Sequence, residues 1–233
     1  MPDVLETLFL AEEVYQEPRY RAAALRAADF LVRAQMPAPQ PAWAQQYNAA
    51  LQPIWARKFE PPAITGGESQ GVIATLLEVF RHTGEPKYLE PIPRALAYLE
   101  ASTLPSGQLA RFYELQTNTP LYFTRDYQLT DDDSDLPTHY SFVVPSRVAS
   151  LKREYERLLQ LSPDERRASL APPKPRRVSE TQARKIIDAQ DARGAWITSE
   201  GLRYHDHAGP VIDMKETVAN LRTLADYLDT AAR

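Results

Sequence analysis

The stretch from Arg111 to Tyr127 reads RFYELQTNTPLYFTRDY. It shows neither the apolar stripe of a helix nor the alternation of a half-buried strand, and Asn118-Thr119-Pro120 is a turn signal. A segment of this kind, rich in arginine, tyrosine and asparagine, is predicted to be a loop that presents a ligand surface. The alternative is an ordinary connecting loop whose aromatic rings cover the ends of neighbouring helices.

Apolar residues recur at helical spacing on both sides of this stretch. Before it, helices are predicted to begin near residues 3, 19 and 65, and a fourth carries buried positions at Leu89, Ile92, Leu96 and Leu99. After it, helices are predicted over 147–161 and 179–188, and a last one carries Met214, Val218, Leu221, Leu224 and Leu228 at core spacing. Thr65 with Glu68 has the spacing of a capping box, and Ser179 with Gln182 is a second N-cap pair.

An internal repeat within the helical pattern predicts the fold. The segment 13–20 reads EVYQEPRY and matches 78–88, in which EVF is followed by EPKY before the next helix. Repeated helix pairs that cannot bury both faces alone have to stack or close into a ring. The predicted fold is all-α, with antiparallel helix hairpins in an (α/α) toroid-like or partial toroid arrangement and long irregular loops.

The predicted organisation has three parts. Residues 1–161 form the helical segment, 162–178 form a proline-rich linker or excursion, and 179–233 form a C-terminal helix pair that packs on the same domain.

Composition excludes several classes of function. The chain has 233 residues and a formal net charge of -4 at pH 7, so overall charge does not favour nucleic acid as a partner. Cysteine is absent, which excludes disulfide and thiolate chemistry. No apolar run approaches the roughly 20 residues of a membrane helix. Residues 1–6 lack the pattern of a secretion signal.

Three stretches carry a family resemblance. They read WAQQY at 43–47 with ARKFE at 56–60, ITGGESQGV at 64–72, and RFYE at 111–114 with Thr117-Asn118, Pro120 and Arg125-Asp126. In these stretches, which with the intervening helices cover roughly residues 3–126, the chain resembles the family 10 polysaccharide lyases, pectate lyases with an all-helical toroid fold.

The resemblance implies calcium-assisted β-elimination of polygalacturonate, an acidic polysaccharide. A base takes the C5 proton, the O4 oxygen leaves, and Ca²⁺ bridges the enzyme and the uronate carboxylate. By similarity Arg125 matches the arginine proposed as the base, although arginine normally stays protonated. The resemblance further suggests two sets of binding residues. The substrate-binding candidates are Arg57, Lys58, Arg111, Asn118, Trp43 and Tyr47, and the metal candidates are Asp126 and Glu68.

The chain also departs from the family pattern. The family element Arg-Asp-Gly is here Arg125-Asp126-Tyr127, and the Asn-Asp motifs that supply calcium ligands in the family would lie before Met1. The resemblance therefore implies either a truncated lyase or one that has lost activity. The family is typically secreted or periplasmic. Two alternatives remain: a non-catalytic remnant that binds acidic polysaccharide, and a helical-repeat scaffold for protein partners.

Several residue patterns allow a functional and a structural interpretation. Trp43, Trp55 and Trp196 can stack on sugar rings, but tryptophan is mostly buried in any fold. The acidic run 131–135 offers oxygen ligands for calcium, but it lacks the pattern of an EF-hand and is expected to be a solvated loop. The pair of histidines in 205–207 lacks an obvious third zinc ligand.

Overall fold

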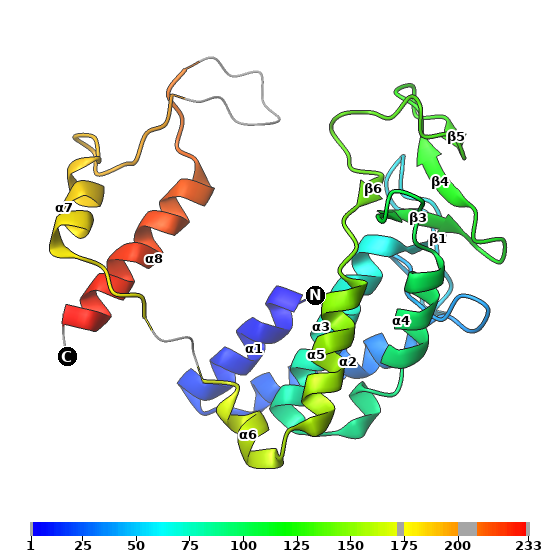
Figure 1. The fold of residues 1–233 in the computed structure, drawn as a ribbon, viewed down its shortest axis with the longest axis horizontal. Helices are drawn as coiled ribbons and strands as arrows, with labels where there is room; N and C mark the ends of the chain where they lie inside the picture. Colours follow the sequence, from blue (N-terminus) through cyan, green and yellow to red (C-terminus); the bar gives the residue numbers. More distant parts are fainter. Residues whose placement is uncertain (1, 172–174, 200–208, 232–233) are drawn as a thin grey trace. The chain divides into compact units, whose positions relative to one another are not determined.

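The computed structural model describes residues 2–171, 175–199 and 209–231 (Figure 1). The chain divides into two compact units, Met1–Ala171 and Pro172–Arg233, called here the N-terminal and the C-terminal unit. The division lies inside the stretch 162–178 that was predicted as a linker, and the first part of that stretch forms a helix. Within the described ranges, no helix is both long and apolar enough to cross a bilayer. The predicted histidine motif at 205–207 lies outside the described residues.

One central helix organises the N-terminal unit. The helices of this unit are α1 (Pro2–Tyr15), α2 (Pro18–Arg33), α3 (Gly66–Thr83), α4 (Ile92–Ala101), α5 (Val148–Gln160) and α6 (Pro163–Ala168), with a 3-10 turn at Pro86–Tyr88. The helix α3 contacts each of the other five. Its buried residues include Ile73, Leu76, Leu77 and Val79, which form the apolar face that the neighbouring helices cover.

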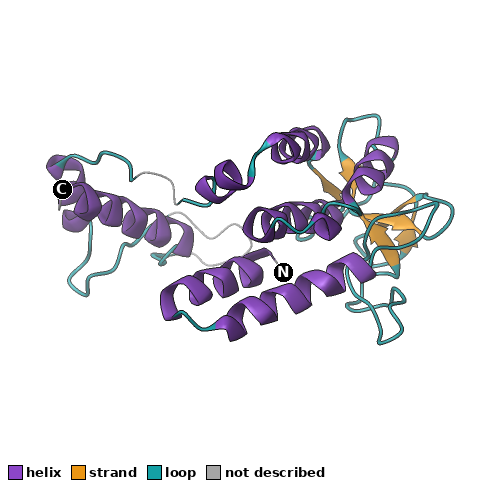
Figure 2. Ribbon diagram, turned by 90° about the horizontal axis from the view of Figure 1, so that it is seen from below, coloured by secondary structure: helices purple, strands orange, loops and turns teal. Residues whose placement is uncertain are grey.

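Two antiparallel sheets gather at one end of these helices (Figures 1 and 2). The first has the strand order β1-β3-β4-β5, and the second pairs β2 with β6. The strands are β1 (Ala63–Thr65), β2 (Leu109–Ala110), β3 (Phe112–Glu114), β4 (Pro120–Phe123), β5 (Leu129–Thr130) and β6 (Val143–Val144). In the register of the first sheet, Phe112 lies opposite both Thr65 and Leu121. The strands therefore lie at the helix termini, together with the loops of the unit.

The prediction of an all-α fold is wrong. About 49% of the described residues are helical, and about 11% lie in strands or isolated β-bridges. The stretch 111–127, which was predicted as a loop, contains the β3–β4 hairpin and the turn after β4. Each strand has only two to four residues, and adjacent Phe112 and Tyr113 are both buried. Strands this short, with both faces covered, leave no alternation to recognise in a sequence.

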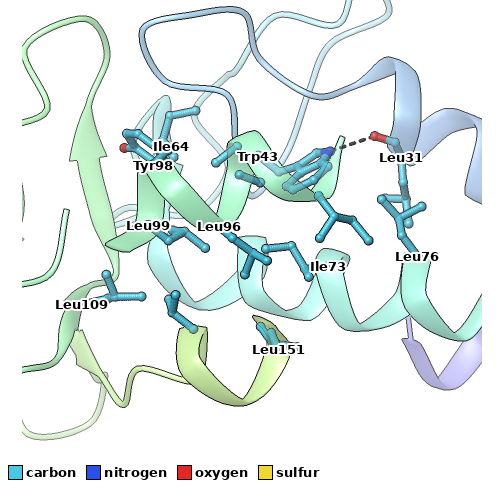
Figure 3. Close-up of a cluster of buried hydrophobic side chains, with 14 of the residues drawn as sticks. Leu31, Trp43, Ile64, Ile73, Leu76, Leu96, Tyr98, Leu99, Leu109 and Leu151 are labelled. Carbon is cyan, nitrogen blue, oxygen red and sulfur yellow. Dashed lines mark hydrogen bonds between the residues drawn. The ribbon is translucent and has the colours of Figure 1, made fainter. Parts of the chain in front are cut away.

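Trp43 lies in the centre of the core (Figure 3). It is 1% exposed, and its Nε1 donates a hydrogen bond of 2.7 Å to the carbonyl of Leu31. The carbonyl of Trp43 in turn accepts from Thr65 Oγ1 at 3.0 Å and from Ser69 Oγ at 3.1 Å. The Thr65 side chain therefore makes no capping bond to α3, so the capping box predicted at this position is wrong.

The start of α3 is defined by a close approach of two backbones. The nitrogen of Gly66 donates to the carbonyl of Arg111 at 2.9 Å. A Cβ atom on Gly66 would lie 2.2 Å from the carbonyl oxygen of Ala110. Only glycine allows the helix to begin so close to β2.

The end of α3 is covered by a side chain from α6. Arg166 is buried, and its Nη1 donates to the carbonyls of Phe80 at 3.1 Å and Arg81 at 3.0 Å. These carbonyls belong to the last turn of α3, where acceptors lack partners within the helix. The carbonyl of Phe80 also accepts from the nitrogen of Gly84, the residue after the helix, at 2.7 Å. Gly84 ends the helix in a left-handed conformation, with φ of 73°. The guanidinium therefore acts as a C-terminal cap supplied from another helix.

The C-terminal unit, described by itself, contains the helices α7 (Glu180–Asp188) and α8 (Met214–Ala231), which contact each other. Ser179 accepts a hydrogen bond from the nitrogen of Gln182, which confirms the predicted N-cap of α7. Trp196 is 7% exposed and donates from Nε1 to the carbonyl of Ile186 at 2.7 Å, so its ring is a core group of this unit. The predicted core positions on α8 are wrong for Met214 and Leu228, each 65% exposed, and equally for Val218 and Leu221, which are 39% and 54% exposed.

Candidate functional site

The loop 53–60 lies against the β4–β5 hairpin. The ring of Trp55 meets the ring of Phe123 edge-on, with centroids 6.1 Å apart. Phe59 stacks on Tyr127 at 5.7 Å, and Lys58 Nζ lies 4.4 Å from the centroid of the same tyrosine ring. These contacts join two segments that are about 70 residues apart in the sequence. We call the resulting surface the loop–turn surface; it consists of Trp55, Arg57, Lys58, Arg125, Tyr127 and His139.

The turn Arg125-Asp126-Tyr127 is a three-residue hairpin loop. The nitrogen of Thr124 donates to the carbonyl of Gln128 at 2.9 Å, and the nitrogen of Tyr127 donates back to Thr124 at 2.9 Å. Tyr127 has φ of 62°. Hairpin loops of this length place a left-handed residue at the last position, usually glycine. The glycine of the family pattern suits this geometry, whereas Tyr127 adopts it at a cost of about 1 kcal/mol and adds a ring to the surface.

Tyr127 belongs to a continuous group of rings. Its Oη lies 3.2 Å from Nε2 of His139, within hydrogen-bonding distance. Phe59 packs between these rings and Tyr140, with centroid distances of 5.8 Å to His139 and 4.5 Å to Tyr140. The guanidinium of Arg111 lies 4.7 Å from the ring centroid of Tyr140. Burial raises the pKa of Tyr140, so its hydroxyl stays protonated. Cations thus contact both ends of the aromatic group.

A buried carboxylate holds the loop 53–60 in place. Glu60 is 2% exposed. Its Oε1 accepts from Gln45 Nε2 at 2.9 Å and from Tyr140 Oη at 3.3 Å, and its Oε2 accepts from the backbone nitrogen of Arg57 at 3.2 Å. A buried charge needs such partners. Sequence reasoning assigned no role to Glu60 or to His139, because their partners lie far away along the chain.

The cationic side chains of the loop–turn surface are open to solvent. Arg57 is 71% exposed and Arg125 is 70% exposed at the side chain. Arg57 Nη1 lies 3.4 Å from Glu60, and Arg125 Nε lies 3.1 Å from Asp135. The carboxylate of Asp135 comes from the acidic run 131–135, which is exposed as predicted. Both members of the Arg125–Asp135 pair are exposed, and such a pair contributes only about 0–1 kcal/mol, so Arg125 can exchange partners. Arg57 pairs with the buried Glu60, but most of its own side chain faces solvent.

The other predicted substrate-binding residues have partners inside the protein. Trp43 is in the core and offers no ring face to a sugar. The hydroxyl of Tyr47 accepts from the nitrogen of Ala44 at 2.6 Å, and burial raises the pKa of Tyr47 to about 12. Arg111 donates to Glu68 at 2.8 Å and to the carbonyl of Ser141 at 2.6 Å. The polar groups of these residues are therefore engaged within the protein, whereas Arg57, Lys58 and Arg125 are exposed.

Asn118 fastens the β3–β4 hairpin to α4. Its Oδ1 accepts from Tyr98 Oη at 2.5 Å and from Gln40 Nε2 at 3.2 Å. Its Nδ2 donates to Ser102 Oγ at 3.0 Å. The residue adopts φ of 62°, a conformation that asparagine tolerates better than most residues. All polar atoms of this side chain are thus engaged within the protein.

Asn118→Ala is expected to lower the free energy of unfolding by about 2 kcal/mol, because it removes three side-chain hydrogen bonds and leaves a less suitable residue in the left-handed conformation. Urea unfolding measures the change. The matched control is Thr117→Ala in the same exposed turn, with an expected change under about 0.5 kcal/mol. Equal stability of the two variants would contradict the structural role of Asn118.

The metal candidates do not form a calcium site by themselves. Glu68 Oε1 accepts from Arg111, and Asp126 lies exposed in the three-residue turn. Within residues 2–171, 175–199 and 209–231, no three Asp, Glu or His side chains converge in a way that could hold a metal ion. Calcium usually takes six to eight oxygen ligands. The described donors therefore do not fit the ion that the resemblance implies.

Comparison with known proteins gives a likeness at the level of the fold. No family model and no curated protein sequence matches the chain. Among solved structures, the chain is similar to a family 10 polysaccharide lyase from Cellvibrio cellulosa, with a TM-score of 0.51 and 22% identity over 67% of this chain and 59% of that chain. A mutant of the family 10 lyase from the same organism, in complex with trigalacturonic acid, matches with a TM-score of 0.49 and 22% identity over 60% of this chain and 51% of that one. The chain thus spans between half and three-fifths of the length of these lyase chains, and over the matched part it shares the fold of the first.

Proposed function

We propose that this chain binds an acidic polysaccharide of the polygalacturonate type at the loop–turn surface. The observation that carries the proposal is an exposed tryptophan ring on the same loop as the exposed cations Arg57 and Lys58. Trp55 is 50% exposed, whereas Trp43 and Trp196 are 1% and 7% exposed. The fold likeness to a polysaccharide lyase and the resemblance of the stretches at 56–60 and 111–126 support the same class of ligand.

The chemistry of the surface suits a chain of uronate units. The flat, weakly polar face of an indole can pack against the C–H face of a sugar ring. The planar guanidinium groups of Arg57 and Arg125 match carboxylates in a bidentate manner, and Lys58 adds a compact charge. A uronate chain presents ring faces and carboxylates in every unit, so the surface can bind both features of one ligand.

The existing ion pairs leave room for such a ligand. Arg125 pairs with the exposed Asp135, so this contact is weak. Arg57 pairs with the buried Glu60, but its side chain is 71% exposed and stays accessible to a ligand. A ligand carboxylate that reaches either guanidinium replaces water as well as part of a weak contact. Binding is therefore expected to decrease as salt rises, because screening acts on all these charges.

A second candidate is β-elimination at the same surface, which the contact of 3.2 Å between Tyr127 Oη and His139 Nε2 favours. An exposed arginine stays protonated, so Arg125 suits carboxylate binding better than proton abstraction. Imidazole is the most frequent general base in enzymes. In this scheme His139 takes the C5 proton, the C5–H electrons form the C4=C5 bond, and the C4–O4 bond breaks. Tyr127 protonates O4 and regains its proton from His139.

The binding proposal is tested by titration calorimetry with trigalacturonate. Arg125→Ala is expected to weaken binding about tenfold, since a charge-assisted contact is worth roughly 1.5–3 kcal/mol and 1.4 kcal/mol is a factor of ten. Trp55→Ala is expected to weaken it by a similar factor. The matched control is Arg19→Ala, because Arg19 is also 70% exposed and also paired with a carboxylate. Affinity that is equal in the wild type, Arg125→Ala and Trp55→Ala would refute the proposal.

The elimination candidate has its own test. Ultraviolet absorbance of an unsaturated uronate product on polygalacturonate, measured with and without added calcium, reports the reaction. His139→Ala is expected to abolish product formation and to leave trigalacturonate affinity nearly unchanged. If the wild-type protein binds trigalacturonate but forms no product, the elimination reaction is rejected and binding remains the function.

A further inference from the structure

The C-terminal unit contains a groove of about 680 Å³ between residues 176–178, α7 and α8. Three arginines line it: Arg176 and Arg177 before α7, and Arg222 on α8. Their guanidinium groups have no ion pair and no hydrogen bond to any part of the chain that the structure describes. The volume lies within the range of about 300–1,000 Å³ that is typical of ligand sites.

The lack of a partner among the described residues distinguishes these arginines from others in the same unit. Arg184 pairs with Glu180 at 2.7 Å, and Arg193 pairs with Asp191 at 2.8 Å. In the groove, three positive charges face one lining carboxylate, that of Asp226. Cations that gather in a concave site and outnumber its carboxylates raise the local concentration of anions.

We propose that this groove binds a carboxylate-bearing sugar chain, separately from the loop–turn surface. The choice of a uronate as ligand rests on the proposed function. Guanidinium groups bind carboxylates in a bidentate manner, and three of them along one groove suit a ligand with several carboxylates. Gln182 and Thr223 also line the groove and offer neutral hydrogen-bonding groups for sugar hydroxyls.

Calorimetric titration of the full chain with trigalacturonate tests this site through its stoichiometry. The wild type is expected to bind two molecules, and a variant with Arg176→Ala, Arg177→Ala and Arg222→Ala is expected to bind one. The control carries Arg184→Ala, Lys185→Ala and Arg193→Ala, which remove the same charge from the same unit outside the groove, and is expected to keep both sites. Circular dichroism verifies that each variant retains the helices. Arg222→Glu alone is expected to weaken the second site at least tenfold.

The two proposals fail in different ways. The groove proposal is overturned if the groove variant still binds two molecules. It is also overturned if the control loses one molecule as the groove variant does. If Trp55→Ala and Arg125→Ala leave binding unchanged while the groove variant abolishes it, the proposed function of the loop–turn surface fails and the groove stands. Inorganic phosphate that displaces trigalacturonate from the groove at equal concentration overturns the assignment to a uronate.

Discussion

Trp43→Ala is expected to lower the free energy of unfolding by about 4 kcal/mol, since truncating a buried aromatic residue typically costs about 3–5 kcal/mol. The indole is 1% exposed and lies within the main core cluster, among side chains from α2 and α3. Truncation removes its dispersion contacts and leaves a cavity that the rigid helices around it cannot fill. It also leaves the carbonyl of Leu31 without the hydrogen bond from Nε1.

The control for this result is the exposed tryptophan. Trp55→Ala is expected to change stability by less than about 1 kcal/mol, because the residue is already 50% exposed. Urea unfolding of both variants, followed by circular dichroism, measures the two free energies. A smaller loss for Trp43→Ala than for Trp55→Ala would contradict the positions of the two rings. The two variants also distinguish a structural role from a binding role, because only Trp55→Ala is expected to weaken the affinity for trigalacturonate.

Gly66→Ala is expected to cost about 3 kcal/mol, whereas Gly67→Ala, one residue later, is expected to be neutral or slightly stabilising. A Cβ on Gly66 would lie 2.2 Å from the carbonyl oxygen of Ala110 and 2.9 Å from Leu109 Cβ, so the strand β2 would have to move. A Cβ on Gly67 would lie 3.8 Å from Val144 Cγ1, an ordinary contact. Alanine in a helix is more favourable than glycine by about 0.5–1 kcal/mol.

Gly66→Ala and Gly67→Ala are therefore a matched pair of variants that tests how closely the start of α3 approaches β2. Thermal unfolding is expected to give a clearly lower midpoint for Gly66→Ala and an unchanged or higher midpoint for Gly67→Ala. Similar midpoints for the two variants would show that α3 does not begin as close to Ala110 as the structure has it. Trigalacturonate binding by the Gly67→Ala variant is expected to match the wild type.

The longer helices of the N-terminal unit could be predicted because they bury one face at the helical period, whereas the short α6 was not predicted and lies in the stretch interpreted as a linker. Leu89, Ile92, Leu96 and Leu99 were predicted as buried and are buried. The predicted helix over 147–161 is α5, Val148–Gln160. On α8 the same period predicted the helix but not the exposure of its apolar face. An apolar stripe at helical spacing shows that a helix can form but does not show what covers it.

The strands and part of the site could not be predicted from the sequence. A strand such as Leu109–Ala110 is defined by its partner Val143–Val144, more than 30 residues away, and by no periodicity of its own. Arg57, Lys58 and Arg125 were selected by resemblance, and their exposure is compatible with binding, which remains a prediction. His139 and Glu60 were missed because their roles depend on Tyr127 and Tyr140, contacts that only the folded chain creates.

The C-terminal cap that Arg166 provides for α3 determines where the N-terminal unit can be truncated. The helical pattern of the sequence suggests an end of the first segment at residue 161, but a fragment that stops there lacks Arg166. Without that guanidinium, the carbonyls of Phe80 and Arg81 lose a donor and the ring of Phe80 loses its cationic neighbour. A truncated N-terminal unit used for ligand studies therefore has to retain α6, so that the shortened protein keeps the stability of the parent chain.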